Sequence, residues 1–96
     1  MFKKKEIRLG GKLISAYLIS LQGKNLILLK GSKGYIMCGY LNLSVANKFQ
    51  DVAAKIVGVS SIEEALKARI HSCTKPASRF GIEKGMPVTK ALRLIS

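Results

Sequence analysis

The sequence of 96 residues predicts a single α+β domain, a mostly antiparallel sheet with helices packed on one face. The first observation is that apolar runs separated by glycines fill the first 41 residues, whereas helix signals begin only at Asn42. The second is size, because 96 residues with 48% hydrophobic content can bury one core. We therefore expect one domain spanning residues 1–96.

The N-terminal part is expected to form a meander of three or four strands. The predicted strands, in order, are Glu6–Leu9, Leu13–Gln22, Asn25–Lys30 and Tyr35–Leu41. Gly10–Gly11 is read as a turn or bulge, and Gly31–Gly34 as a short turn bounded by glycines. Gly23–Lys24 suits a two-residue type II′ hairpin, in which glycine comes first.

The remaining residues predict helices with one or two returning strands. Asn42 or Ser44 can cap a first helix, whose apolar spacing runs to Ala53. The next predicted elements are a strand at Lys55–Ser60, a helix opened by a capping box at Ser61–Glu64 and ending near Ala68, and a short strand at Ile70–Cys73. A brief helix is bracketed by Pro76 and Gly81, and a last helix begins at Pro87 with an apolar stripe at Val88, Ala91, Leu92 and Ile95.

The predicted strand Leu13–Leu21 is apolar on both of its faces. A helix layer covers only one face of a sheet, so a second copy of the chain is expected to cover the other. We therefore predict a homo-oligomer. No apolar run is long enough to cross a bilayer, and the two cysteines do not form a disulfide framework. A cytoplasmic protein with reduced thiols and no membrane partner is expected.

The net charge is +12, and residues 1–48 hold nine basic residues against a single acidic one. Such a field attracts polyanions, so RNA binding through the basic surface is an alternative function. Lys30 and Lys33 are its candidate residues, because Gly31-Ser32-Lys33-Gly34 matches the GXXG loop of one RNA-binding module. That loop joins two helices, whereas strand-like runs flank this one, and a hairpin turn is the simpler interpretation.

The segment Gly34–Leu43, GYIMCGYLNL, places a thiol and a glycine at a predicted strand-to-helix junction. A helix N-terminus near Cys38 could stabilise a thiolate, and the basic field could attract an anion to Cys38, Gly39 and Asn42. A nucleophile elbow would need a glycine where Ile36 stands. The simpler interpretation of Cys38 is a small buried hydrophobic residue.

His71 and Cys73 lie on one face of a predicted strand and, with Cys38, could supply three zinc ligands. The zinc deaminase spacing is absent, and the sequence has no further His or Cys to complete a structural site. A Cys38–His71 dyad is the other way to use these side chains. We assign no catalytic residue, no metal and no cofactor, and Cys38 and His71 remain the nearest catalytic candidates.

GYIMCGYLNL, KIVGVSSIEEAL and FGIEKGMPVTKAL together resemble the small YunC-like proteins of bacteria and archaea, a domain of unknown function. The resemblance spans nearly the whole chain in the same order, and it implies a compact α+β domain that stands alone in the cytoplasm. It carries no catalytic residue to transfer. The family pattern often has an acid where this chain has Asn42, which weakens an enzyme built on a Cys–Asp pair.

These observations favour a self-associating, non-enzymatic module that binds a small anionic ligand near Cys38–Asn42. RNA binding is the first alternative. A thiol-dependent enzyme that uses Cys38 is the second.

Overall fold

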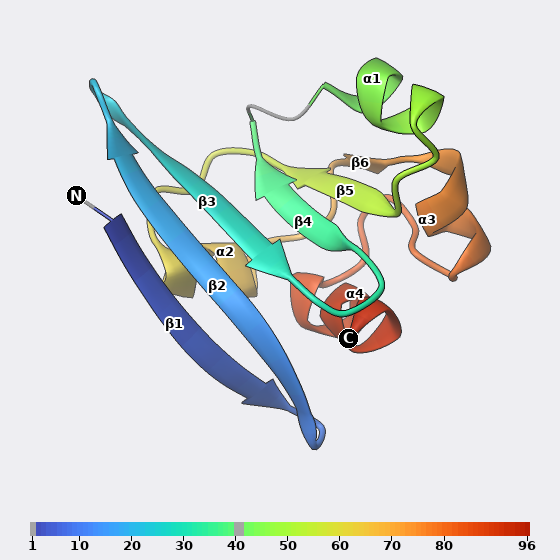
Figure 1. Cartoon of the computed structure of the whole chain (residues 1–96), viewed down its shortest axis with the longest axis horizontal. Coiled ribbons are helices and arrows are strands. Elements are labelled where there is room, and N and C mark those ends of the chain that lie inside the picture. Colours follow the sequence, from blue (N-terminus) through green and yellow to red (C-terminus); the bar gives the residue numbers. More distant parts are fainter. Residues whose placement is uncertain (1, 40–41) are drawn as a thin grey trace.

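The fold is described from a computed structural model that places residues 2–39 and 42–96. Within these residues, six strands form one sheet whose spatial order follows the chain from β1 to β6 (Figure 1). The strands are β1 Phe2–Leu9, β2 Lys12–Leu21, β3 Lys24–Lys30, β4 Tyr35–Cys38, β5 Ala53–Ile56 and β6 Ser72–Cys73. The helices are α1 Leu43–Lys48, α2 Ile62–Lys67, α3 Lys75–Arg79 and α4 Val88–Ile95. The predicted α+β class with a mostly antiparallel sheet is confirmed.

Strands β1 to β4 form the predicted meander, with antiparallel pairing throughout. Gly10 and Gly11 make a two-residue turn, and both have positive φ, the conformation that favours glycine. The β2–β3 turn differs from the prediction. Leu21 pairs with Lys24, so the loop is Gln22–Gly23 and its glycine comes second, with φ of 76°. The expected type II′ turn, with glycine first, was wrong.

Strands β4 and β5 are parallel, and α1 connects them. The predicted first helix was too long, since α1 ends at Lys48 and Gln50 adopts φ of 60°, which no helix can continue. Ala53 consequently begins β5, and the strand predicted at Lys55–Ser60 ends at Ile56. Residues 40 and 41, the predicted end of β4, lie outside the described residues.

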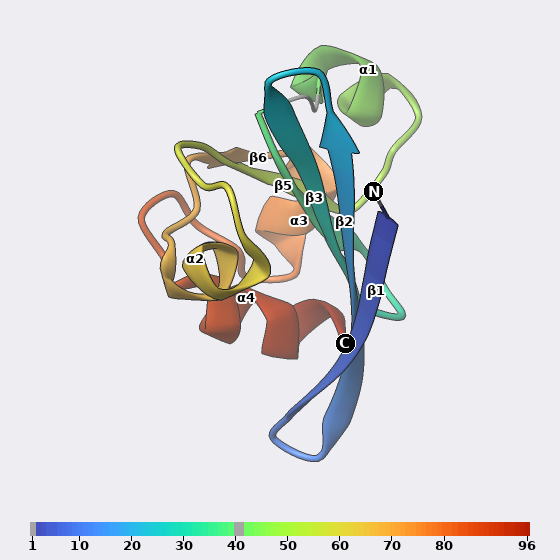
Figure 2. The same cartoon turned by 90° about the vertical axis from the view of Figure 1, so that its left-hand side faces the viewer.

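Helices α2, α3 and α4 lie together on one side of the sheet (Figure 2). The predicted α4 stripe of Val88, Ala91, Leu92 and Ile95 is fully buried against it. The sheet contributes side chains of alternate residues to this core, including Ile14, Ala16 and Leu18 of β2 and Ile27 and Leu29 of β3. One face of the sheet is therefore sealed by helices, as predicted.

The short helices begin at the side-chain caps that the sequence contains. Ser61 Oγ accepts the backbone N–H of Glu64, and Asn42 Oδ1 accepts those of Ser44 and Val45. The Glu64 carboxylate departs from the ordinary capping box, since it accepts from Ser60 rather than from Ser61. None of the helices in residues 2–39 and 42–96 is long and apolar enough to span a membrane.

Candidate functional site

A hollow of about 410 Å³ lies where the parallel strands β4 and β5 end. We call it the Cys38 hollow; its lining residues are Gly23, Lys24, Asn25, Cys38, Gly39, Gly58, Val59 and Ser60. Three separate segments build it: the start of β3, the end of β4 and the loop that follows β5. The carboxyl ends of neighbouring parallel strands are a common place for ligands in open sheets.

Cys38 lines this hollow and is 4% exposed. Its Sγ accepts the backbone N–H of Ile27 at 3.2 Å and donates to the carbonyl of Asn25 at 3.5 Å. Both partners belong to β3, the neighbouring strand. The thiol proton therefore has a partner within the fold, and Cys38 is positioned as a hydrogen-bonded core residue that contributes to a cavity wall.

The loop after β5, which forms one wall of the hollow, is held by a series of hydrogen bonds. The Asn25 side-chain amide donates to the carbonyl of Ser60 at 2.8 Å. Ser60 in turn donates to Glu64 Oε1 through its backbone N–H at 2.7 Å and its hydroxyl at 2.9 Å. The two hydrogen bonds from Ser60 lower the pKa of Glu64 below its ordinary value and so keep the carboxylate ionised. They also fix the loop to α2. The hollow is therefore preformed on this side.

Of the residues predicted to bind an anion, the structure brings Cys38 and Gly39 into one hollow. Asn42 is instead the N-cap of α1, and its side-chain oxygen is occupied by two backbone N–H groups. Lys24, which the sequence reasoning did not single out, is the cationic side chain in the lining. Its only sequence signal was a position beside Gly23, and the pairing of β3 with β4 is what brings it near Cys38.

His71 and Cys38 are not brought together. Strand β5 lies between β4 and the β6 region, so two strand spacings, about 9–10 Å, separate the two backbones. The His71 side chain is exposed, with its Nδ1 3.1 Å from Ser72 Oγ. Burial raises the pKa of the Cys73 thiol. Within residues 2–39 and 42–96, no three His, Cys, Asp or Glu side chains cluster as metal ligands.

Lys30 ends β3, and Lys33 lies within the hairpin turn of residues 31–34 that leads to β4. The backbone N–H of Gly31 donates to the carbonyl of Gly34 at 2.9 Å, and Lys30 pairs with Tyr35. The turn also contacts the end of α4, because the Lys33 backbone N–H donates to the Ile95 carbonyl at 2.7 Å. The turn interpretation of this glycine pair is confirmed, and the segment does not join two helices.

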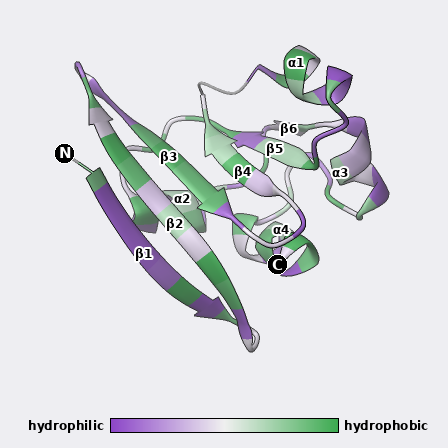
Figure 3. Cartoon of the chain, viewed as in Figure 1, coloured by the Kyte–Doolittle hydropathy of each residue, from purple (hydrophilic) through white to green (hydrophobic). Residues whose placement is uncertain are grey.

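The side of the sheet away from α2, α3 and α4 carries an apolar surface that we call the open apolar face. Its residues are Phe2, Tyr17, Ile19, Leu26, Leu28 and Met37, which also surround a shallow hollow of about 280 Å³ with Lys30. They are neighbours across the strands, since Tyr17 pairs with Leu28 and Leu28 with Met37. Figure 3 shows the apolar stretches of β2 and β3 beside the mostly hydrophilic β1.

Tyr35 lies at the border of this face and donates a hydrogen bond to Asp51 Oδ2 at 2.8 Å. Burial, followed by this bond and the Asp51 charge, raises the pKa of Tyr35 to about 12. The unfolded chain loses the same proton near pH 10, so the contribution of this group to stability is present below pH 10 and is lost as the pH rises to about 12.

Comparison with known proteins identifies the family. A family model described as a domain of unknown function, DUF1805, matches residues 37–95, which is more than half of the chain. The chain belongs to this family. The match begins at Met37, so within the described residues it includes Cys38 at the end of β4, strands β5 and β6, and helices α1 to α4.

Two relatives extend the DUF1805 similarity to the N-terminal meander. The chain is 34% identical over 90 residues to the uncharacterized protein YunC of Bacillus subtilis, covering 90% of this chain and 89% of that protein. It is also similar to a protein of unknown function, TA1206 of Thermoplasma acidophilum, whose crystal structure aligns with a TM-score of 0.96 at 32% identity. That alignment covers 100% of this chain and 94% of the other. The predicted YunC-like membership is confirmed.

Proposed function

We propose that this chain is a non-enzymatic binding module that holds a small anionic ligand in the Cys38 hollow. The observation that carries the proposal is the place of the hollow at the carboxyl ends of β4 and β5, with Lys24 in its lining. Its volume of about 410 Å³ is in the range of small-molecule sites.

The lining favours an anion that binds backbone groups and pairs with one cationic side chain. Gly23, Gly39 and Gly58 leave their peptide groups uncovered by side chains, so a phosphate or carboxylate can approach the backbone closely. The Lys24 ammonium provides opposite charge, and the net charge of +12 raises the local concentration of anions. In the proposed site, the buried and hydrogen-bonded thiol of Cys38 forms part of the wall and does not act as a nucleophile.

We further propose that two copies associate through the open apolar face. The molecule measures 34 × 32 × 22 Å, so its broad side offers room for the roughly 800 Å² per partner that a stable interface buries. Phe2 is 62% exposed there and lies 6.2 Å from the ring of Tyr17. A patch of contiguous apolar side chains of this kind marks an interaction site more often than scattered exposed residues do.

Inorganic phosphate titrated into the ¹⁵N-labelled full chain tests the ligand proposal by NMR. We expect saturable shifts of the backbone amides of Gly39, Gly58 and Lys24. Lys24→Ala should weaken phosphate binding about tenfold, since one charge-assisted contact contributes about 1.5 kcal/mol.

Lys84→Ala is the matched control, because it removes the same charge from an exposed loop remote from the hollow. It should leave the phosphate affinity within about twofold of the wild-type value. Shifts scattered over the lysine-rich surface, or equal shifts in the Lys24→Ala protein, would overturn the proposed site.

A further inference from the structure

Strand β1 is an edge strand with one unpaired side along its whole length. It is the terminal strand of the sheet, and its eight residues pair only with β2. Edge strands of this length present a row of unpaired N–H and C=O groups that can accept another strand. No other described part of the chain forms a strand against this side.

The pairing register identifies which backbone groups are free. The two-residue turn makes Leu9 and Lys12 a hydrogen-bonded pair, so Ile7, Lys5 and Lys3 also bond to β2. The backbone N–H and C=O groups of the alternate residues point away from β2, and they form the free edge of the sheet. These residues are Phe2, Lys4, Glu6 and Arg8.

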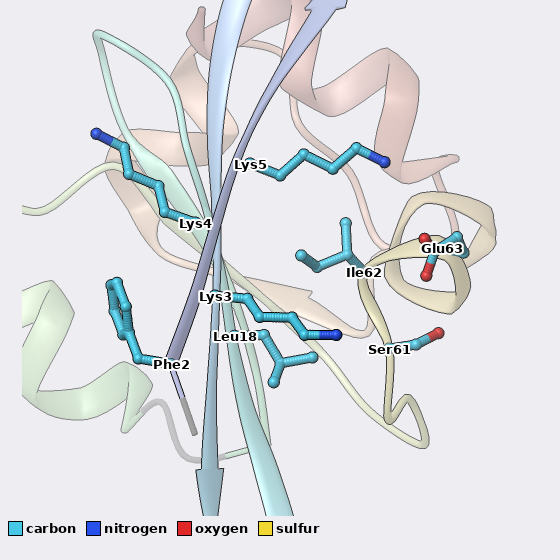
Figure 4. A pocket seen from close by; sticks show the side chains of 8 residues that line it. All are labelled: Phe2, Lys3, Lys4, Lys5, Leu18, Ser61, Ile62 and Glu63. Carbon is cyan, nitrogen blue, oxygen red and sulfur yellow. The ribbon is translucent and has the colours of Figure 1, made fainter.

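A cleft of about 620 Å³ runs beside this edge, between β1 and the start of α2 (Figure 4). Lys3 and Lys5 extend from β1 toward α2, while Phe2 and Lys4 extend to the other side of the strand. Leu18 and Ile62 provide an apolar floor, and Glu63 stands on the α2 wall. In the described residues, the ion pair is Lys4 with Glu6 at 3.8 Å, which leaves Lys3 and Lys5 without a carboxylate.

The charges on β1 oppose pairing with a second copy of itself. An antiparallel two-fold pairing centred on Lys4 would place that lysine opposite its own copy, and one centred on Glu6 would pair two glutamates. A pairing centred on Lys5 would set Lys4 against Glu6, but it would still place the two Lys5 side chains opposite each other on the cleft side. Lysines on an edge strand commonly prevent this kind of self-association. The edge therefore accepts a strand of opposite charge more readily than its own kind.

We propose that β1 binds an extended acidic peptide of another protein by β-strand addition. The peptide backbone pairs with the outward groups of Lys4, Glu6 and Arg8. Every second peptide side chain lies over the cleft, where Lys3 and Lys5 favour Asp or Glu and the Leu18–Ile62 floor accepts an apolar residue. Among these 96 residues the longest acidic run is Glu63–Glu64, so no segment of the given sequence is itself such a peptide.

The free backbone edge distinguishes this partner from a nucleic acid. A nucleic acid would use the lysines, but it has no alternating N–H and C=O groups at the strand spacing of about 4.8 Å. Glu63 in the cleft wall also opposes a densely charged phosphate backbone more strongly than a peptide that can place an apolar residue there.

A fluorescently labelled peptide of about nine residues tests the proposal, with Glu and Val taking turns at every second position, so that both lie on one face, and Thr at the positions between them. It is titrated with the full chain and followed by anisotropy. An identical peptide, N-methylated at successive amides so that neither of its edges can donate, keeps the charge but cannot pair as a strand. We expect it to bind at least tenfold more weakly. Equal binding by the two peptides would overturn strand addition.

Protein variants separate the contributions of charge and backbone. Lys3→Ala with Lys5→Ala should lower affinity about tenfold, because two exposed ion pairs contribute about 1 kcal/mol or less each. The control, Lys48→Ala with Lys84→Ala, removes the same charge from α1 and from an exposed loop outside the cleft lining, and it should change affinity less than threefold. Glu6→Pro removes an outward N–H that makes no bond to β2, and it should also weaken binding while circular dichroism stays unchanged.

Two results would overturn the inference even if acidic peptide binds. One is equal loss of affinity in the Lys3/Lys5 and Lys48/Lys84 variants, which would show attraction by net charge alone. The other is tighter binding of a single-stranded oligonucleotide with the same number of charges, which would make the β1 edge and its cleft a nucleic-acid surface.

Discussion

The buried hydroxyl of Thr74 joins three segments that are far apart in the sequence. Thr74 is 0% exposed, and its Oγ1 donates to the carbonyl of Asp51 at 2.7 Å. The same oxygen accepts the backbone N–H groups of Ala53 and Ala77, each at 3.2 Å. It therefore caps α3 and also fixes the start of β5, although the sequence alone predicted neither role.

Thr74→Val should destabilise the protein by about 3 kcal/mol or more. The isosteric methyl group leaves buried backbone groups of Asp51, Ala53 and Ala77 without a partner, and each such group costs about 1–3 kcal/mol. The urea midpoint measures this change. Thr74→Ser keeps the hydroxyl and should cost about 1 kcal/mol, and equal stability of the two variants would contradict the argument.

At the scale of elements, the β3–β4 turn is fixed by its contact with the C-terminal end of α4. A Cβ placed on Gly31 would collide with the carbonyl oxygen of Ile95 and with the backbone of Ser96. The hydrogen bond from Lys33 to the same Ile95 carbonyl shows how closely the two elements approach. Gly31 is thus required for close approach, in contrast to the turn glycines that are required for their φ.

Gly31→Ala should cost about 2 kcal/mol or more, because the turn and α4 cannot both keep their positions. Thermal unfolding followed by circular dichroism measures the loss. Gly39→Ala is the matched control, since a Cβ there meets no atom of a described residue beyond its chain neighbours within 4 Å, and it should stay within about 0.5 kcal/mol of wild type. A Gly31→Ala protein as stable as that control would show that the contact is dispensable.

At the scale of the whole molecule, the sheet has one face covered by helices and one open apolar face. Leu28 lies at the centre of that face, between Tyr17 and Met37. Lys4, Arg8, Lys30 and Lys55 occupy strand positions on the same side, so two copies that meet there bring like charges near one another. Association is therefore expected to combine apolar attraction with repulsion at the rim.

Leu28→Lys should convert the self-associated protein to a monomer, because it buries a charge at the centre of the interface. Size-exclusion chromatography with light scattering measures the mass. Raising the salt to about 0.5 M should increase the associated fraction of wild type by screening the rim. Val57→Lys, at an exposed position in the β5–α2 loop, should leave the mass unchanged. A monomeric wild-type protein at both salt concentrations would refute the proposed interface.

Local signals predicted much of this protein, because their physical causes act within a few residues. Glycines placed the turns of the meander, the spacing of Val88, Ala91, Leu92 and Ile95 predicted the buried face of α4, and Ser61 predicted the start of α2. The same reasoning placed Cys38 and Gly39 together, and both line the Cys38 hollow because they lie at the end of one strand. Family membership also followed from motifs that can be read along the chain.

The tertiary structure decided what depends on contacts between distant segments. Ala53 has good helical spacing in the sequence, yet it joins β5 because parallel pairing with Tyr35 and the Thr74 hydroxyl satisfy its backbone. Lys24 reaches the Cys38 hollow only because β3 and β4 are neighbours in the sheet. The free edge of β1 and the cleft beside α2 arise from strand order and helix placement. No local propensity encodes these relations, because they depend on which segments meet in the folded chain.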